Sequence, residues 1–123
     1  MPELELELPA EPGSAAAARR AVEGELGLAG EILDTVKLLV SELVTNSVRH
    51  AGLPASAAIA LRVRAERELV RVEVTDPGHG FDPAERPEPS EDGGWGLRLV
   101  ESLADRWGVE RTPAARVWCE LDR

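Results

Sequence analysis

Two neighbouring runs of alternating residues constrain this chain more than any other feature. In residues 59–64 and 70–75, aliphatic side chains alternate with polar or small ones. A period of two is typical of strands buried on one face, and the polar stretch near Glu66 predicts an antiparallel hairpin between them. Asp76 continues the even-numbered series of valines, so we expect it to leave its strand on the buried face. A carboxylate directed toward apolar surroundings requires a partner.

Similar alternation predicts three further strands. Residues 3–8 alternate Glu with Leu and predict a strand at a sheet edge, where the glutamates discourage unwanted pairing. Alternation on either side of Pro113 predicts a second hairpin, from strands over residues 107–112 and 116–121.

Amphipathic periods and end signals predict three helices. They cover residues 15–26, with Ser14 as the N-cap, then residues 31–51 and residues 97–106.

Strands and helices that occur in separate runs indicate an α+β fold. We therefore expect a two-layer sandwich, in which helices pack on one face of a mixed, mostly antiparallel sheet. The length of 123 residues predicts a single domain over residues 1–123. Within it, residues 77–94 are rich in Pro, Gly and acidic residues, and a loop of that length is typical of a functional lid.

Charge and composition narrow the classes of function. The formal net charge of −9 disfavours direct binding to nucleic acids and docking to anionic membranes. Cys119 is the one cysteine, which excludes an intramolecular disulfide and favours a cytoplasmic location. The chain starts without the pattern of a signal peptide and has no apolar run of about 18 residues, so we expect no membrane association.

The segment 41–51, with the sequence SELVTNSVRHA, carries the first candidate constellation. Glu42 and Asn46 are four residues apart and lie on one face of the predicted helix, with Arg49 and His50 a further turn along. Taken alone, this stripe is more typical of the polar face of an ordinary amphipathic helix.

Two glycine-containing turns follow. Asp76 opens the sequence DPGHGF, which includes Gly78 and Gly80, and the sequence GGWGLR at residues 93–98 precedes the third predicted helix. Glycines allow backbone to approach a ligand, and a helix N-terminus presents free N–H groups to phosphate. Each turn by itself is also compatible with a plain loop, and a lone glycine-rich turn is weak support for a nucleotide site.

Taken in this order and spacing, the segments resemble the motifs of the GHKL superfamily of ATPases, which has the Bergerat ATP-binding fold. Its members include DNA gyrase, heat-shock chaperones, sensor histidine kinases and mismatch-repair ATPases. Nearly the whole chain is similar to the small, stand-alone anti-sigma-factor serine/threonine kinases. The N-box corresponds to Glu42 and Asn46, the G1 box to Asp76-x-Gly78-x-Gly80, and the G2 box to Gly94-x-Gly96-Leu97.

The resemblance implies a role for each matching residue. Asn46 would be a ligand of Mg²⁺, Glu42 the general base, and Asp76 the acceptor of the adenine amino group. Gly78 and Gly80 would pass under the base and ribose. Gly94 and Gly96 would let backbone N–H groups approach the phosphates, and Arg98 would reach them too, although a plain surface arginine is an equal interpretation. Arg49 and Leu97 are further candidate residues for binding the nucleotide.

The resemblance also implies a function. The chain would bind ATP and Mg²⁺, hold a sigma factor inactive, and phosphorylate a serine or threonine of an anti-sigma-factor antagonist. Homodimer formation stays open, because relatives of this type are commonly dimers. The alternative is a non-catalytic module that sequesters a protein partner, which the acidic segment 77–94 and the bulky Trp95 favour. A fragment of a sensor histidine kinase is disfavoured, because no helical segment with an acceptor histidine precedes the first strand.

Overall fold

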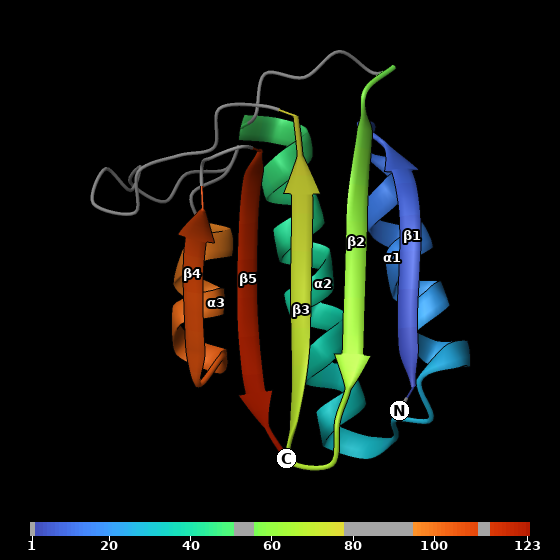
Figure 1. The fold of residues 1–123 in the computed structure, drawn as a ribbon, viewed down its shortest axis with the longest axis vertical. Helices are drawn as coiled ribbons and strands as arrows, with labels where there is room; N and C mark the ends of the chain where they lie inside the picture. The colour runs from blue at the N-terminus through green and yellow to red at the C-terminus, as the bar shows by residue number, and fades with distance from the viewer. Residues whose placement is uncertain (1, 51–55, 78–94, 111–113) are drawn as a thin grey trace.

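A computed structural model describes residues 2–50, 56–77, 95–110 and 114–123. Its five strands form one sheet in the order β1-β2-β3-β5-β4 (Figure 1). The two predicted hairpins are confirmed as β2–β3 and β4–β5, and β1 lies at an edge as expected. The strands are β1 (Glu3–Pro9), β2 (Ala58–Ala65), β3 (Leu69–Asp76), β4 (Arg106–Glu110) and β5 (Ala115–Asp122).

Every pair of neighbouring strands in the described residues is antiparallel, so the expectation of a mixed sheet was wrong. The connections explain the difference. Two successive helices separate β1 from β2, and together they bring the chain back to the end of the sheet where β1 finishes. The strand β2 therefore starts beside the last residues of β1 and runs in the opposite direction. The strands β3 and β4 do run in the same direction, but β5 lies between them and is antiparallel to both.

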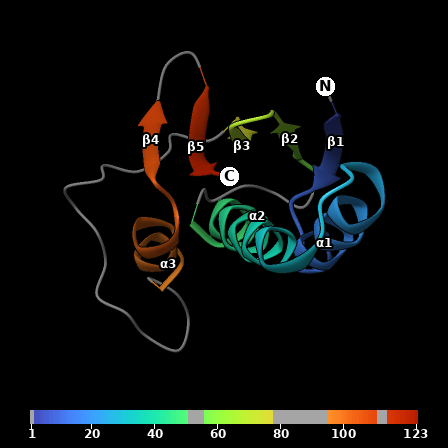
Figure 2. The same cartoon turned by 90° about the horizontal axis from the view of Figure 1, so that it is seen from below.

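The three helices all lie on one face of this sheet, which confirms the α+β class and the two-layer arrangement (Figure 2). They are α1 (Gly13–Glu25), α2 (Gly30–His50) and α3 (Trp95–Leu103). No helix in the described part of the chain is long and apolar enough to cross a bilayer.

Two details of the predicted helices were wrong. Pro12 is the N-cap residue of α1, and no side chain among the described residues caps that end. Ser14 lies inside the first turn, where its hydroxyl donates to the Pro9 carbonyl oxygen at 2.5 Å and thereby ties the end of β1 to α1. In addition, α3 begins two residues earlier than predicted and ends at Leu103, because Arg106 already pairs with β5 as the first residue of β4.

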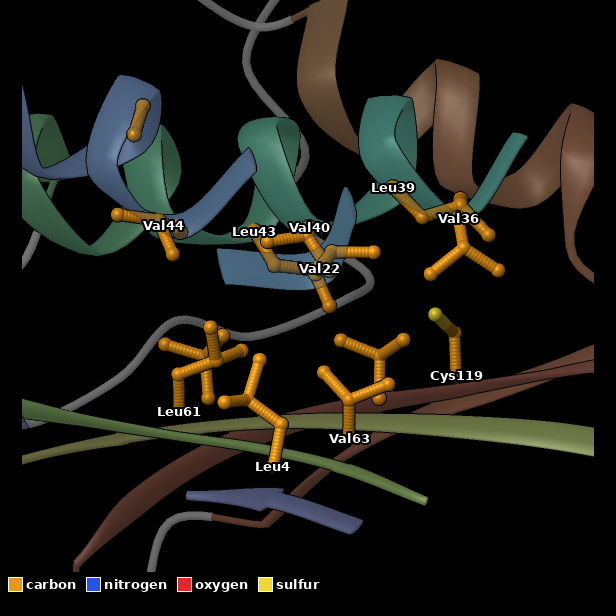
Figure 3. Close-up of a cluster of buried hydrophobic side chains, with 14 of the residues drawn as sticks. Leu4, Val22, Val36, Leu39, Val40, Leu43, Val44, Leu61, Val63 and Cys119 are labelled. Carbon is orange, nitrogen blue, oxygen red and sulfur yellow. The ribbon is translucent and has the colours of Figure 1, made fainter. Parts of the chain in front are cut away.

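The core lies between the sheet and the paired helices α1 and α2 (Figure 3). Aliphatic side chains at the predicted spacing on α2 face the inward residues of the strands. The α2 residues that are at most 1% exposed are Val36, Leu39, Val40, Leu43 and Val44. Cys119 lies below Val36 in this layer and is fully buried. Burial raises the pKa of its thiol to about 12, so the group stays protonated and acts as a small apolar residue.

The opposite face of the sheet carries charged residues and one aromatic ring. Arg71 lies between two carboxylates, at 2.7 Å from Glu73 and 2.9 Å from Glu120. Its guanidinium carbon lies 4.4 Å from the centroid of the Trp118 ring. That ring also covers Gly108 of the adjacent strand, where a Cβ atom would come within 2.8 Å of it. Trp118 therefore covers the open side of the sheet within its own chain.

Candidate functional site

The connections bring three ends of secondary structure to one end of the molecule. Residue 76 ends β3, and the antiparallel β2 begins beside it, so the preceding helix α2 has its C-terminus at that end. Because β4 runs in the same direction as β3, the preceding helix α3 starts at that same end. Figure 1 shows the last turn of α2 behind the tip of β3. The topology therefore brings three predicted motifs to the end of the sheet that carries residue 76. They are the N-box, the start of the G1 box and the end of the G2 box.

Asp76 is a buried carboxylate at the tip of β3. Its side chain belongs to the helix-facing series of Val70, Val72 and Val74, as the alternation predicted, and the residue is 6% exposed. The residue opposite it in β5 is Ala115, which is also buried. An acceptor with little access to water, next to small apolar neighbours, suits a flat ligand that offers an N–H group.

The structure places Glu42 and Asn46 on α2, one turn apart and both half-buried. The buried Leu43 and Val44 lie between them in sequence, so the polar pair lies beside the side of α2 that faces the core. Arg49 is exposed in the last turn of the same helix. The predicted spacing on one helical face is thus present, with both residues only partly covered.

A hydrogen bond that sequence reasoning missed lies next to Glu42. The Arg19 guanidinium on α1 donates to the Ser41 hydroxyl on α2 at 2.6 Å. It joins the two helices at the residue that precedes the predicted general base. Serine and arginine are common on exposed helix faces, so nothing in their sequence context predicted this contact.

The G2 residues Gly96 and Leu97 lie in the first turn of α3, where backbone N–H groups have no partner within the helix. Arg98 follows them in that turn and is exposed. The rest of the glycine motifs and the predicted lid lie outside the described residues, namely Gly78, Gly80, Gly94 and the segment from residue 78 to 94.

These groups fit the nucleotide and metal that the resemblance implies. Asp76 offers a buried acceptor for an exocyclic amino group, and the first turn of α3 offers N–H donors for phosphate. Asn46 offers a neutral oxygen, which Mg²⁺ accepts together with phosphate oxygens and water. Glu42 lies one turn before Asn46 on α2, where a carboxylate would serve as the base for a hydroxyl held near that metal.

Comparison with known families agrees with this geometry. Residues 8–118 match the family model of the histidine kinase-like ATPase domain. The chain belongs to the histidine kinase-like ATPase family. Solved structures support the fold: a blue-light activated histidine kinase of Erythrobacter litoralis aligns with a TM-score of 0.62 at 24% identity. The alignment covers 93% of this chain but only 42% of that histidine kinase.

The chain is also similar to curated proteins that are serine-protein kinases. The serine-protein kinase RsbW of Oceanobacillus iheyensis is 30% identical over 118 residues, which cover 83% of this chain and 75% of that protein. The serine-protein kinase RsbW of Listeria innocua is 34% identical, with coverage of 81% and 74%. The predicted superfamily is confirmed. The predicted subfamily consists of serine/threonine kinases, and the similar proteins include serine-protein kinases.

Proposed function

We propose that this chain is a cytoplasmic, ATP-dependent serine/threonine protein kinase that holds a sigma factor inactive and phosphorylates an antagonist protein. The observation that carries the proposal is the arrangement of Glu42, Asn46 and Asp76 around one end of the sheet, in a family whose relatives include serine-protein kinases. The proposed catalytic unit is the single domain over residues 1–123, and its ATP lid is the segment 77–94.

Three side chains have defined tasks in this proposal. Asp76 accepts the adenine amino group, while Asn46 holds Mg²⁺, which neutralises charge on the phosphates. Glu42 accepts the proton of the attacking serine or threonine hydroxyl. Phosphoryl transfer needs mainly positioning and charge neutralisation, which such a set supplies.

The remaining predicted residues would surround the nucleotide. Glycines let backbone approach the base and the phosphates closely, and the proposed ones are Gly78, Gly80, Gly94 and Gly96. The further residues proposed to bind the nucleotide are Leu97, Arg49 and Arg98, of which Arg98 would reach the phosphates.

Release of the antagonist also follows from charge. A phosphate adds about −1.5 to −2 charges to the antagonist, and this chain carries a formal net charge of −9. The phosphorylated antagonist is therefore repelled more strongly than the unmodified one, which would leave the kinase available to the sigma factor. This control of transcription needs no direct contact between the chain and nucleic acid.

The test is transfer of the labelled γ-phosphate of ATP to a cognate antagonist, with Glu42→Gln as the variant. We expect the variant to bind ATP normally and to lose at least about 100-fold in transfer rate, the typical contribution of a positioned base. Glu31→Gln is the matched control, because Glu31 is an exposed residue in the first turn of the same helix. No transfer by the wild-type chain in the presence of the true antagonist would contradict the proposal.

The second candidate function is a module that sequesters a protein partner without catalysis. The observation that favours it is the composition of the segment 77–94, which is poorly suited to neutralising phosphate. Arg86 is its single arginine, and it contains no lysine. Its acidic residues are Asp82, Glu85, Glu88, Glu91 and Asp92. The variant Glu42→Gln separates the two functions, because a sequestering module keeps its effect on the partner when turnover is lost.

A further inference from the structure

The sheet has a free edge along β1 (Figure 1). Within the described residues, β2 pairs with one side of β1 and no strand pairs with the other. Two backbone bonds flank this pairing. The Ala65 N–H donates to the Pro2 carbonyl oxygen at 3.0 Å, and the Ala10 N–H donates to the Ala57 carbonyl oxygen at 3.1 Å. On the β1 side, both bonds therefore belong to even-numbered residues.

These two bonds determine which backbone groups of β1 face the free edge. In an antiparallel pair, every second residue exchanges its N–H and C=O bonds with the neighbouring strand, and the residues between direct these groups away from it. The even-numbered residues of β1 bond to β2, so the backbone groups of Glu3, Glu5 and Glu7 lie at the free edge. Pro9 has no N–H and ends this row of donors.

The same three residues place carboxylates on the open face of the sheet. Arg62 of β2 forms ion pairs with Glu3 and, at 3.4 Å, with Glu5. Glu7 lies opposite Ala60, and no described residue forms an ion pair with it. The free edge therefore keeps a surplus of negative charge on this face.

The face of β1 toward the helices is apolar. Leu4 and Leu8 are buried there, but Leu6 between them is only half-buried. An apolar side chain from an adjacent strand would cover Leu6, because side chains directly opposite on paired strands lie about 4.5–5.5 Å apart.

The pairing of β1 with β2 shows which sequence pattern suits these two faces. β2 carries arginines opposite Glu3 and Glu5 on the open face, and the aliphatic residues that alternate with them face the helices. A strand on the free edge would meet the same row of glutamates and the same row of leucines. Alternating basic and apolar residues therefore complement this edge as well.

A second copy of this chain does not supply such a strand. If two β1 strands paired antiparallel through their free edges, a glutamate or Pro9 would lie opposite each glutamate in every register, and like charges in opposite positions destabilise a sheet. The other edge strand, β4, carries Arg106, Gly108 and Glu110 on its open face, of which only the arginine is basic.

We propose that the free edge of β1 binds an extended segment of a partner protein, in which basic residues alternate with apolar ones, as an additional strand of the sheet. The backbone of this segment bonds to Glu3, Glu5 and Glu7. Its basic side chains meet their carboxylates, and its apolar side chains cover Leu6. The proposed kinase mechanism does not use this surface, so the inference is independent of the nucleotide site.

The test uses a synthetic peptide of the length of β1, in which Lys alternates with Val, and measures amide hydrogen exchange of the chain by NMR. At a peptide concentration about ten times the dissociation constant, exchange of the Glu5 and Glu7 amides should slow about tenfold, because only the unbound fraction exchanges. The amides of Leu4, Leu6 and Leu8 already bond to β2, so their exchange should change much less.

A peptide of the same composition, with its Lys residues grouped at one end, controls for plain attraction to the net charge of −9. It should bind more weakly and leave the Glu5 and Glu7 amides unprotected. Equal affinity of the two peptides, or equal slowing of odd- and even-numbered amides, would overturn the proposal. Protection of Glu5 and Glu7 without peptide, at high concentration of the chain, would identify a second copy as the occupant and would also overturn it.

Two variants separate the contribution of charge from that of the backbone. Glu7→Gln should weaken peptide binding about two- to fivefold, the range for one cross-strand pair of opposite charges. Glu110→Gln is the matched control, because Glu110 is an exposed glutamate of the other edge strand, and it should leave the affinity unchanged.

Glu7→Pro removes a donor at the free edge but no bond to β2, so the variant should fold and lose at least about tenfold in peptide affinity. Wild-type affinity in folded Glu7→Pro would overturn the proposal. If Glu7→Pro does not fold, wild-type affinity in Glu7→Gln would overturn it instead.

Discussion

The two faces of the sheet come from the same strands but hold the molecule together in different ways. On the face toward the helices, Leu61 and its neighbours are almost fully buried in an apolar layer. On the open face, Arg62 and Arg71 pair with carboxylates of the sheet. Burial of apolar area is the larger contribution to stability, while exposed ion pairs contribute little. The proposed site departs from this pattern, because Asp76 and Ser47 are polar residues that are nevertheless buried.

The largest effect that tests this comparison is expected at Leu61. Leu61→Ala leaves a cavity in the layer between sheet and helices and should lower the free energy of unfolding by about 2–5 kcal/mol. Arg62→Ala is the control on the opposite face of the same strand and should have a much smaller effect, because water screens its exposed ion pair. Urea denaturation measures both. Equal losses would show that the two faces do not differ as described.

A smaller loss is expected for Gly108→Ala on the open face. The new Cβ would meet the Trp118 ring at 2.8 Å, so the ring must shift from its position beside Arg71. Overpacking of this kind typically costs about 1–3 kcal/mol. In the double variant with Trp118→Ala the clash is absent, so the two losses should not add. Additive losses in urea denaturation would contradict the contact.

The smallest effect is expected at Glu120. Hydrogen bonds from Arg106, and secondarily from Arg71, lower the pKa of its carboxyl below the ordinary value. Since the folded state holds the charged form, this stabilisation is present above the unfolded value of about 4.3 and is lost as the pH falls through the folded pKa. Glu120→Gln should therefore cost about 0.5–1 kcal/mol at pH 7.

The same variant tests the direction of the pH dependence of stability. The difference in unfolding free energy between Glu120→Gln and wild type should shrink as urea denaturation is repeated from about pH 7 down to about pH 3. A difference that stays constant over this range would mean that the charge of Glu120 contributes nothing.

Local patterns in the sequence were enough to predict most elements of this fold. The alternation around Leu61 and Val72 predicted β2 and β3, and it placed Asp76 on the buried face, because side-chain direction depends only on parity within a strand. The position of β5 between β3 and β4 was not predicted. Strand order depends on contacts between distant segments, which no local pattern records.

The candidate site was predictable to a similar degree. Motif spacing proposed Glu42, Asn46 and Asp76 as site residues, and the topology places their elements at one end of the sheet. The burial of Ser47 was not predicted, because a serine within a helix is ordinary and only its low exposure distinguishes it. The wrong N-cap has a related cause: Ser14 can donate as well as accept, and it bonds to the Pro9 carbonyl instead.

The pairing of Asp76 with Ala115 also sets an order of events during synthesis. The strands β1 to β3 and the helices α1 and α2 are complete before residue 77 leaves the ribosome, but β3 then has one unpaired edge. Until residues 115–122 follow, that edge can pair with other chains, which is a typical route to aggregation of nascent proteins. The strand that pairs with Asp76 at the proposed nucleotide site is thus the last strand of the sheet to be synthesised.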